Sequence, residues 1–221
     1  MSKRLLTVLG GGRKPWYLTA GVTPIAAYQA IGATSYAASK VNLANHGTHD
    51  LVEGIQPGWA KASGWASTGT EYLLMGIAAN IVTYSVIVRF SDAEAVDGKL
   101  MFGSNEGGVG KRFGFGVYAA GIRYRYINYD TTIAPVITSG TLAISNLKGY
   151  RNGAVESFTA TAAAYTTGNL ALLGYWNGVG LDNGYIGKIQ AAAVYDQALT
   201  PAQVLLLHTN MMLLDENTAP F

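Results

Sequence analysis

Residues 184–204 read GYIGKIQAAAVYDQALTPAQV, and they predict a long strand that leads into a helix. We expect residues 186–195 to form the last strand. Thr200, Pro201 and Gln203 fit a capping box, with Thr200 as the N-cap and Pro201 at the first helical position. Apolar residues then recur with helical spacing, which predicts a helix over residues 201–213.

The chain from Ile25 onward reads as many short β segments separated by turn residues. Residues 81–90 (IVTYSVIVRF) form the strongest predicted strand because they are rich in β-branched and aromatic side chains. Residues 99–103 are expected to be its neighbour, after a turn at Asp97-Gly98. Further strands are predicted at residues 113–118, 122–129, 141–144, 147–150, 157–161 and 170–173.

Two local patterns sharpen this expectation. Arg123 and Arg125 alternate with Tyr124 and Tyr126, which predicts one wet face on that strand. Asn152-Gly153 is a signal for a type I′ hairpin turn. Together, the short strands and turns predict an all-β antiparallel β-sandwich (jelly roll) with one short C-terminal helix.

Composition narrows the function classes. The 221 residues suffice for one large domain, and the 49% apolar content supports a full core. Charged residues make up only 13%, against about 25% in typical soluble proteins, which suggests a surface partly covered by partners. The net charge of +2 gives no general electrostatic case for nucleic acid. The absence of cysteine excludes disulfides and thiolate metal sites, and no stretch is apolar for the ~18 residues of a membrane span.

Residues 1–24 differ from the remainder of the chain. Gly10-Gly11-Gly12 and Pro15 interrupt regular structure, so Trp16 and Tyr17 need a surface to pack against. Two alternatives stay open: an extended arm that docks on a neighbouring subunit, or a segment folded back on its own sandwich. We expect three parts, which are an N-terminal arm (1–24), a sandwich (25–214) and a C-terminal tail (215–221).

The order of several motifs resembles laminin G-like domains, which belong to the concanavalin A-like lectin and glucanase fold. Residues 184–204 resemble the family's closing strand and helix, and Tyr150-Arg151-Asn152-Gly153 is similar to its Tyr-x-Asn-Gly hairpin. Residues 65–73 look like its Phe-x-Gly-x-x-x-Tyr-Leu strand. Residues 27–28 and 39–42 resemble its opening strand and Ser-x-x-Asn loop. The resemblance spans about residues 25–212.

Residues 15–21 and 41–45 also resemble laminin G-like proteins carried by tailed bacteriophages. This resemblance implies a non-enzymatic virion structural protein, such as a fibre, tail or capsid-decoration component, located in the virion or outside the cell. Its partners would be further copies of itself, other virion proteins and host cell-surface carbohydrate. The alternative is a carbohydrate-binding lectin-like module, and a glycoside hydrolase ranks below both.

The acidic residues argue against catalysis. Retaining glucanases of this fold place two carboxylates on alternate residues within one strand, about 5 Å apart. Asp92 and Glu94 have that spacing but lie where a strand ends in a turn, which indicates a solvated turn. We therefore expect no enzyme. No cofactor is expected either, although calcium remains an alternative, with Asp182 and Asn183 joined by Asp92 or Asp97 as oxygen ligands.

One loop has the chemistry of a glycan site. Sugar recognition needs aromatic rings for the apolar sugar faces and amide or carboxylate groups for the hydroxyls. The candidate residues are Tyr175, Trp176, Asn177, Asp182, Asn183 and Tyr185. The alternative is a tryptophan tucked under a long loop.

Overall fold

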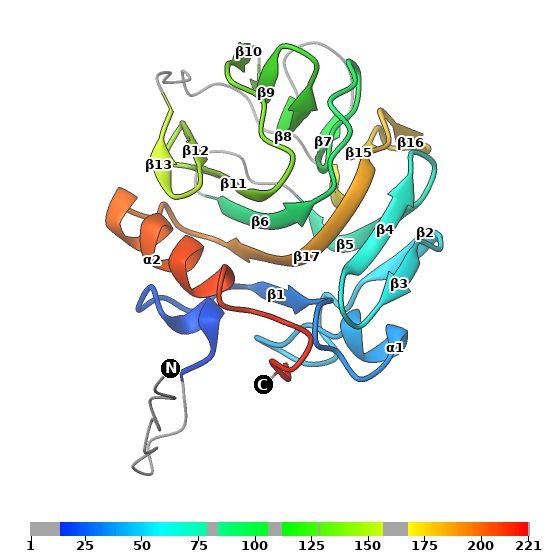
Figure 1. Ribbon diagram of the computed structural model, residues 1–221, viewed down its shortest axis with the longest axis vertical. Coiled ribbons are helices and arrows are strands. Elements are labelled where there is room, and N and C mark those ends of the chain that lie inside the picture. Colours follow the sequence, from blue (N-terminus) through cyan, green and yellow to red (C-terminus); the bar gives the residue numbers. More distant parts are fainter. Residues whose placement is uncertain (1–13, 79–83, 106–111, 128, 157–167, 221) are drawn as a thin grey trace, which may run out of the picture.

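The computed structural model describes residues 14–78, 84–105, 112–127, 129–156 and 168–220, and it shows two β-sheets packed face to face (Figure 1). Sheet A has the order β13-β12-β11-β6-β17-β4-β3, with β1 also pairing with β17. Its strands are β1 (Ala26–Gln29), β3 (Gly58–Ala60), β4 (Gly64–Thr68), β6 (Ser85–Ser91), β11 (Gly140–Ser145), β12 (Lys148–Arg151), β13 (Ala154–Val155) and β17 (Ile186–Tyr195).

Sheet B has the order β10-β9-β8-β7-β14-β5-β2, and the short β15 pairs with both β7 and β16. Its strands are β2 (Val52–Ile55), β5 (Tyr72–Ala78), β7 (Phe102–Asn105), β8 (Arg112–Tyr118), β9 (Gly121–Ile127), β10 (Tyr129–Ile133), β14 (Asn169–Leu172), β15 (Tyr175–Trp176) and β16 (Leu181–Asp182). Helices are short: η1 (Trp16–Leu18), α1 (Tyr36–Ser39) and α2 (Pro201–Met211). The predicted antiparallel sandwich with one C-terminal helix is confirmed.

The core lies between the sheets because successive side chains of a strand point to opposite faces. Aromatic side chains fill it. Phe102 stacks on Phe115 with ring centroids 5.3 Å apart, and Phe113 meets Tyr126 edge to face at 5.7 Å. Trp65 closes the core from sheet A and donates from its ring nitrogen to the Ser39 hydroxyl at 2.8 Å. This packing fixes which face of each strand points outward.

The C-terminal elements agree closely with the sequence. β17 covers residues 186–195, and α2 starts at Pro201 behind a complete capping box. The Gln203 amide donates to the Thr200 hydroxyl, and the Thr200 amide donates to the Gln203 side chain at 2.8 Å. The predicted type I′ turn is supported by positive φ angles at Asn152 (51°) and Gly153 (79°).

One predicted strand pairing is wrong. β7 does not pair with β6 but lies in sheet B beside β8 and β14, while β6 pairs with β11 and β17 in sheet A. The segment between them crosses from one sheet to the other, and the Ala93 amide ties it to the Thr138 carbonyl at 3.0 Å. Of the predicted strands, residues 81–83 and 157–161 lie outside the described part of the chain.

The outer face of sheet A is covered by η1, α2 and the C-terminal tail (Figure 1). Trp16 and Tyr17 are buried there, and the Tyr195 hydroxyl donates to the Tyr17 carbonyl at 2.7 Å. The Trp16 ring nitrogen donates to the Gln29 side chain at 3.2 Å. In this structure the pair therefore belongs to the core of its own domain rather than to an extended arm, as the second sequence alternative has it.

The C-terminal tail is also tied to the sandwich. The Gln29 side chain donates to the Thr218 carbonyl at 2.7 Å, and Gly32 lies so close that a Cβ there would stand 2.2 Å from the same oxygen.

Throughout the described residues, every helix is too short or too polar to cross a membrane.

Candidate functional site

The outer face of sheet B is built on a row of small residues. Residues directly opposite each other in paired strands share a face. The registers therefore align Ala171, Gly103, Gly114, Arg125 and Asp130 in one row across β14, β7, β8, β9 and β10. The Tyr175 ring fills the space above Gly103, since a Cβ on that residue would lie 2.6 Å from it.

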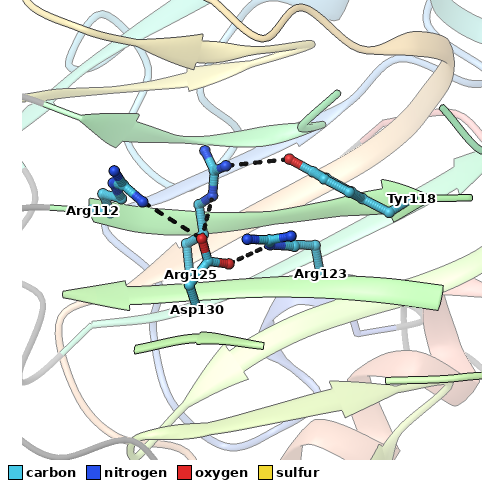
Figure 2. Close-up of polar contacts among 5 residues, drawn as sticks. All are labelled: Arg112, Tyr118, Arg123, Arg125 and Asp130. Carbon is cyan, nitrogen blue, oxygen red and sulfur yellow. Dashed lines mark hydrogen bonds and ion pairs between the residues drawn. The ribbon is translucent and has the colours of Figure 1, made fainter. Parts of the chain in front are cut away.

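Beyond this ring lies the arginine cluster, which we define as Arg112, Arg123, Arg125 and Asp130 (Figure 2). The Asp130 carboxylate accepts a short hydrogen bond from Nε of Arg123. Nη1 of Arg112 stands 3.5 Å and Nε of Arg125 stands 3.4 Å from its other oxygen. One carboxylate thus pairs closely with Arg123 and more loosely with the other two guanidinium groups.

Two tyrosines hold the guanidinium groups against the sheet. The Arg123 guanidinium lies over the Tyr118 ring at 5.1 Å, and that of Arg125 lies over the Tyr175 ring at 5.5 Å. Nη2 of Arg125 also donates to the Tyr118 hydroxyl at 3.4 Å (Figure 2). These cation–π contacts orient the cations while leaving most of their N–H groups unused.

The charges alter the acidities of the site. The hydrogen bond to Asp130 raises the pKa of Arg123, despite the opposing effect of partial burial. Burial raises the pKa of Tyr118, and the neighbouring Arg125 and Arg123 oppose that rise. The same holds for Tyr175, where burial raises the pKa against Arg125 and Arg112. Arg123 therefore stays charged, and the Tyr118 and Tyr175 phenols stay neutral, across the physiological range.

The site keeps unused hydrogen-bonding capacity. Among the described residues, the Nε groups of Arg112 and Arg125 and the Oδ1 atom of Asn105 are buried without a hydrogen-bond partner. Asn105 pairs with Arg112 in the register of β7 and β8, so these groups adjoin. Arg112 and Arg123 nevertheless keep 28% and 30% of their side-chain surface in solvent.

An aromatic pair flanks the site on the same face. Trp176 and Tyr72 are both partly exposed, with ring centroids 5.6 Å apart and a tilt of 32°. Trp176 belongs to the β15–β16 hairpin, whose tip carries Asn177 and the 92% exposed Val179. The Asn177 side chain accepts the Val179 and Gly180 amides and so stiffens the tip.

The predicted glycan residues are only partly assembled. Trp176, Asn177, Asp182 and Asn183 reach solvent to some degree, but Tyr175 and Tyr185 are fully buried. Tyr185 packs in the main core, and Tyr175 packs with Leu100 and Tyr118 on the sheet. These two rings cannot present a face to a sugar, so their expected role as direct contacts needs correction.

The acidic residues considered for calcium binding or catalysis form other contacts in the structure. Asp92 forms an ion pair with Lys188 at 2.7 Å, and Asp97 accepts the Ala119 amide at 3.3 Å. The Leu100 amide donates to the Asn183 carbonyl, so the two loops do meet. The described part of the chain brings no three His, Asp or Glu side chains into one metal-binding group.

Sequence reasoning missed Arg112, Asp130 and Tyr118 as site residues. A signal existed in the alternation of Arg123 and Arg125 with buried tyrosines, which correctly predicted a polar face. What the alternation did not show is that β8 and β10 add a third arginine and a carboxylate to that face. Those neighbours are set by strand pairing.

These features define an antiparallel β-sandwich of the jelly-roll, concanavalin A-like kind with one charged outer face. No family model matches the chain, and no curated protein matches it. Solved structures do. A Trypanosoma rangeli sialidase in complex with 2,3-difluorosialic acid matches 86% of this chain at 10% identity and a TM-score of 0.60. The botulinum neurotoxin serotype D binding domain matches 86% at 9% identity and a TM-score of 0.56.

The chain spans about a third of that sialidase and about half of the toxin domain chain. At these identities the likeness shows a shared lectin-like β-sandwich fold.

Proposed function

We propose that this protein is a non-enzymatic carbohydrate-binding module of lectin-like fold, and that it binds a glycan on the outer face of sheet B. The observation that carries the proposal is the juxtaposition of a partly exposed aromatic pair and a cluster of hydrogen-bond donors on one face. Trp176 and Tyr72 supply ring surface, while Arg112 and Arg125 supply N–H groups. Sugars require both kinds of contact.

Two further points support the proposal. The Asn177 turn holds the hairpin tip beside Trp176, which lowers the entropy cost of binding. The sialidase of similar fold is described in complex with a sugar ligand. The proposal includes the absence of catalysis, because Asp92 and Glu94, which have the spacing of a catalytic carboxylate pair, both lie in an exposed turn.

A glycan array tests the proposal. The wild-type chain should bind a defined subset of glycans, and Trp176→Ala should weaken that binding by about tenfold or more because a large apolar contact is lost. Trp176→Phe keeps an aromatic ring and should retain most of the affinity. Thermal unfolding of each variant checks that the fold is intact. An array without binding to the wild type would refute carbohydrate binding.

The second candidate is a structural role in a bacteriophage particle, in the virion or outside the cell, as the resemblance of residues 15–21 and 41–45 implies. The observation that favours it is a row of exposed apolar side chains along α2 and just beyond it: Leu205, Leu206, Met212 and Leu213. Such a face suits contact with a second copy of the chain.

Light scattering during size-exclusion chromatography tests this role. The wild type should form a homo-oligomer, and Leu206→Glu with Leu213→Glu should give monomers because both side chains would bring charge into the contact. A wild type that stays monomeric at its highest soluble concentration would contradict self-assembly through α2.

A further inference from the structure

The arginine cluster carries more positive charge than its described neighbours neutralise. Each guanidinium has five N–H donors. Within the described residues, Arg112 and Arg123 each donate one hydrogen bond to Asp130, and Arg125 donates one to Tyr118 while its Nε stands 3.4 Å from Asp130. Three positively charged side chains in the described part of the chain thus face one carboxylate.

The next carboxylate does not remove this excess. Asp97 acts on Arg123 only through space, and its own oxygen accepts the Ala119 amide at 3.3 Å. Counting Asp97 and Asp130 against the three arginines still leaves a positive balance. Burial of the Arg112 Nε group makes the excess more costly, because this donor has no hydrogen-bond partner among the described residues and forfeits its hydration.

The guanidinium groups of the cluster are also held in defined positions. Arg123 and Arg125 are held over tyrosine rings, and Asp130 fixes the spacing between the guanidinium groups (Figure 2). The planar guanidinium fork matches the paired oxygens of a carboxylate or a sulfate and can donate two parallel hydrogen bonds. Partly exposed side chains of Arg112 and Arg123 leave the cluster reachable from solvent.

We infer that the arginine cluster is an anion subsite that takes a carboxylate or sulfate group carried by the glycan, and this inference rests on the proposed function. Asp130 acts as the resident counter-ion: it positions the arginines and, by its charge, limits their affinity for a second anion. Removing its charge should therefore strengthen anion binding, which no purely structural role would do.

Nuclear magnetic resonance of the whole ¹⁵N-labelled chain tests the subsite directly. The arginine Nε–H signals are followed during titration with glucuronate, glucose 6-sulfate and glucose. Glucuronate or glucose 6-sulfate should shift the Arg112 and Arg125 signals saturably, whereas glucose should not. The two charged arms separate a carboxylate from a sulfate ester. Equal responses to glucose and to both anions would overturn the inference.

Variants make the test specific. Arg125→Gln should weaken anion binding by at least about tenfold, because a charge-assisted hydrogen bond is lost. Lys148→Gln on sheet A removes a positive charge elsewhere, as Arg125→Gln does at the site, and should leave anion binding unchanged. Asp130→Asn should strengthen anion binding several-fold. An Asp130→Asn variant that remains folded and binds the anion no better would overturn the counter-ion role and the subsite with it.

The outcomes also separate this inference from the proposed function. Binding of neutral glycans that depends on Trp176, with no anion response at the arginines, would refute the subsite and leave carbohydrate binding intact. A silent glycan array together with saturable anion shifts would refute carbohydrate binding and with it the glycan as the carrier of the anion.

Discussion

In both sheets, alternate side chains point outward, but the two outer faces differ in what covers them. Across sheet A, the registers align Ala27, Ala193, Ile87, Ala143 and Tyr150 in one row. Across sheet B, the corresponding row ends in Arg125 and Asp130. The first row is sealed by α2 and η1, and the second is left partly open. The apolar row is covered by other segments of the chain, whereas the charged row stays partly exposed to solvent.

Each face also uses arginine in its own way. Arg89, on sheet A, is directed beneath the end of α2, where it donates to the Met211 and Leu214 carbonyls at 2.7 Å each. It therefore adds a charged donor to the Met211 carbonyl, which also accepts the Leu214 amide, and to the Leu214 carbonyl just beyond the helix. Arg112, on sheet B, pairs only loosely with the Asp130 carboxylate, at 3.5 Å. The same side-chain type thus serves stability on one face, whereas on the other we propose that it serves recognition.

The largest expected effect on stability comes from weakening the packing of α2 on sheet A. Leu207→Ala removes a fully buried side chain of α2 and should lower the free energy of unfolding by about 2–5 kcal/mol. Leu206→Ala, one residue away but 44% exposed, should change it by less than about 0.5 kcal/mol. Urea unfolding measures both. Equal losses for the two variants would show that α2 does not seal the face as described.

The next effect compares the two arginines. Arg89→Met leaves two carbonyls without their charged donor and should cost about 1.5–3 kcal/mol of stability. Arg112→Met should cost at most about 1 kcal/mol, because its ion pair is partly exposed. A larger loss of stability for Arg112→Met than for Arg89→Met would contradict this expectation, because it would show that the arginine cluster has a structural role.

The smallest effect concerns the turn that joins the sheets. Glu71 lies between β4 of sheet A and β5 of sheet B, and its carboxylate accepts hydrogen bonds from the Ser67 hydroxyl and the Thr68 amide. Burial by itself raises the pKa of Glu71, but the hydrogen bonds, led by that of the Thr68 amide, outweigh it and lower the value to about 2.

Because the folded pKa lies below the unfolded one, the carboxylate contributes its full stability above the ordinary pKa and loses it as pH falls. We expect stability to fall between about pH 5 and pH 2, and Glu71→Gln to flatten part of that decline. Thermal unfolding across this range measures it. An unchanged pH profile in Glu71→Gln would assign the acid sensitivity to other carboxylates.

Much of the fold was readable in the sequence where the deciding interactions are local. The capping box at Thr200 and Gln203 involves residues three apart, and the type I′ turn depends on the φ preferences of Asn152 and Gly153. The pairing of residues 99–103 was misread, because the choice between a hairpin and a crossing to the other sheet depends on distant partners, which are β14 for β7 and β11 and β17 for β6.

The site shows the same division. Trp176 and the polarity of the Arg123–Arg125 face were accessible from residue type and alternation. The burial of Tyr175 and Tyr185 could not be predicted, because the residue type does not show whether an aromatic ring in a loop points toward the core or toward solvent. Only the register of β8, β9 and β10 placed Arg112 and Asp130 beside Arg125.

By itself, the sequence determined the β class, the strand at residues 186–195, the capped helix and the alternation that makes one strand face polar. Tertiary structure decided which faces are covered, where Trp16 and Tyr17 lie, and how three arginines come to share one carboxylate. The physical reason is that a capping box and period-two alternation are read from near neighbours. Coverage and strand pairing instead join segments whose contact the alternation does not reveal, from 18 residues apart for Arg112 and Asp130 to 178 for Tyr17 and Tyr195.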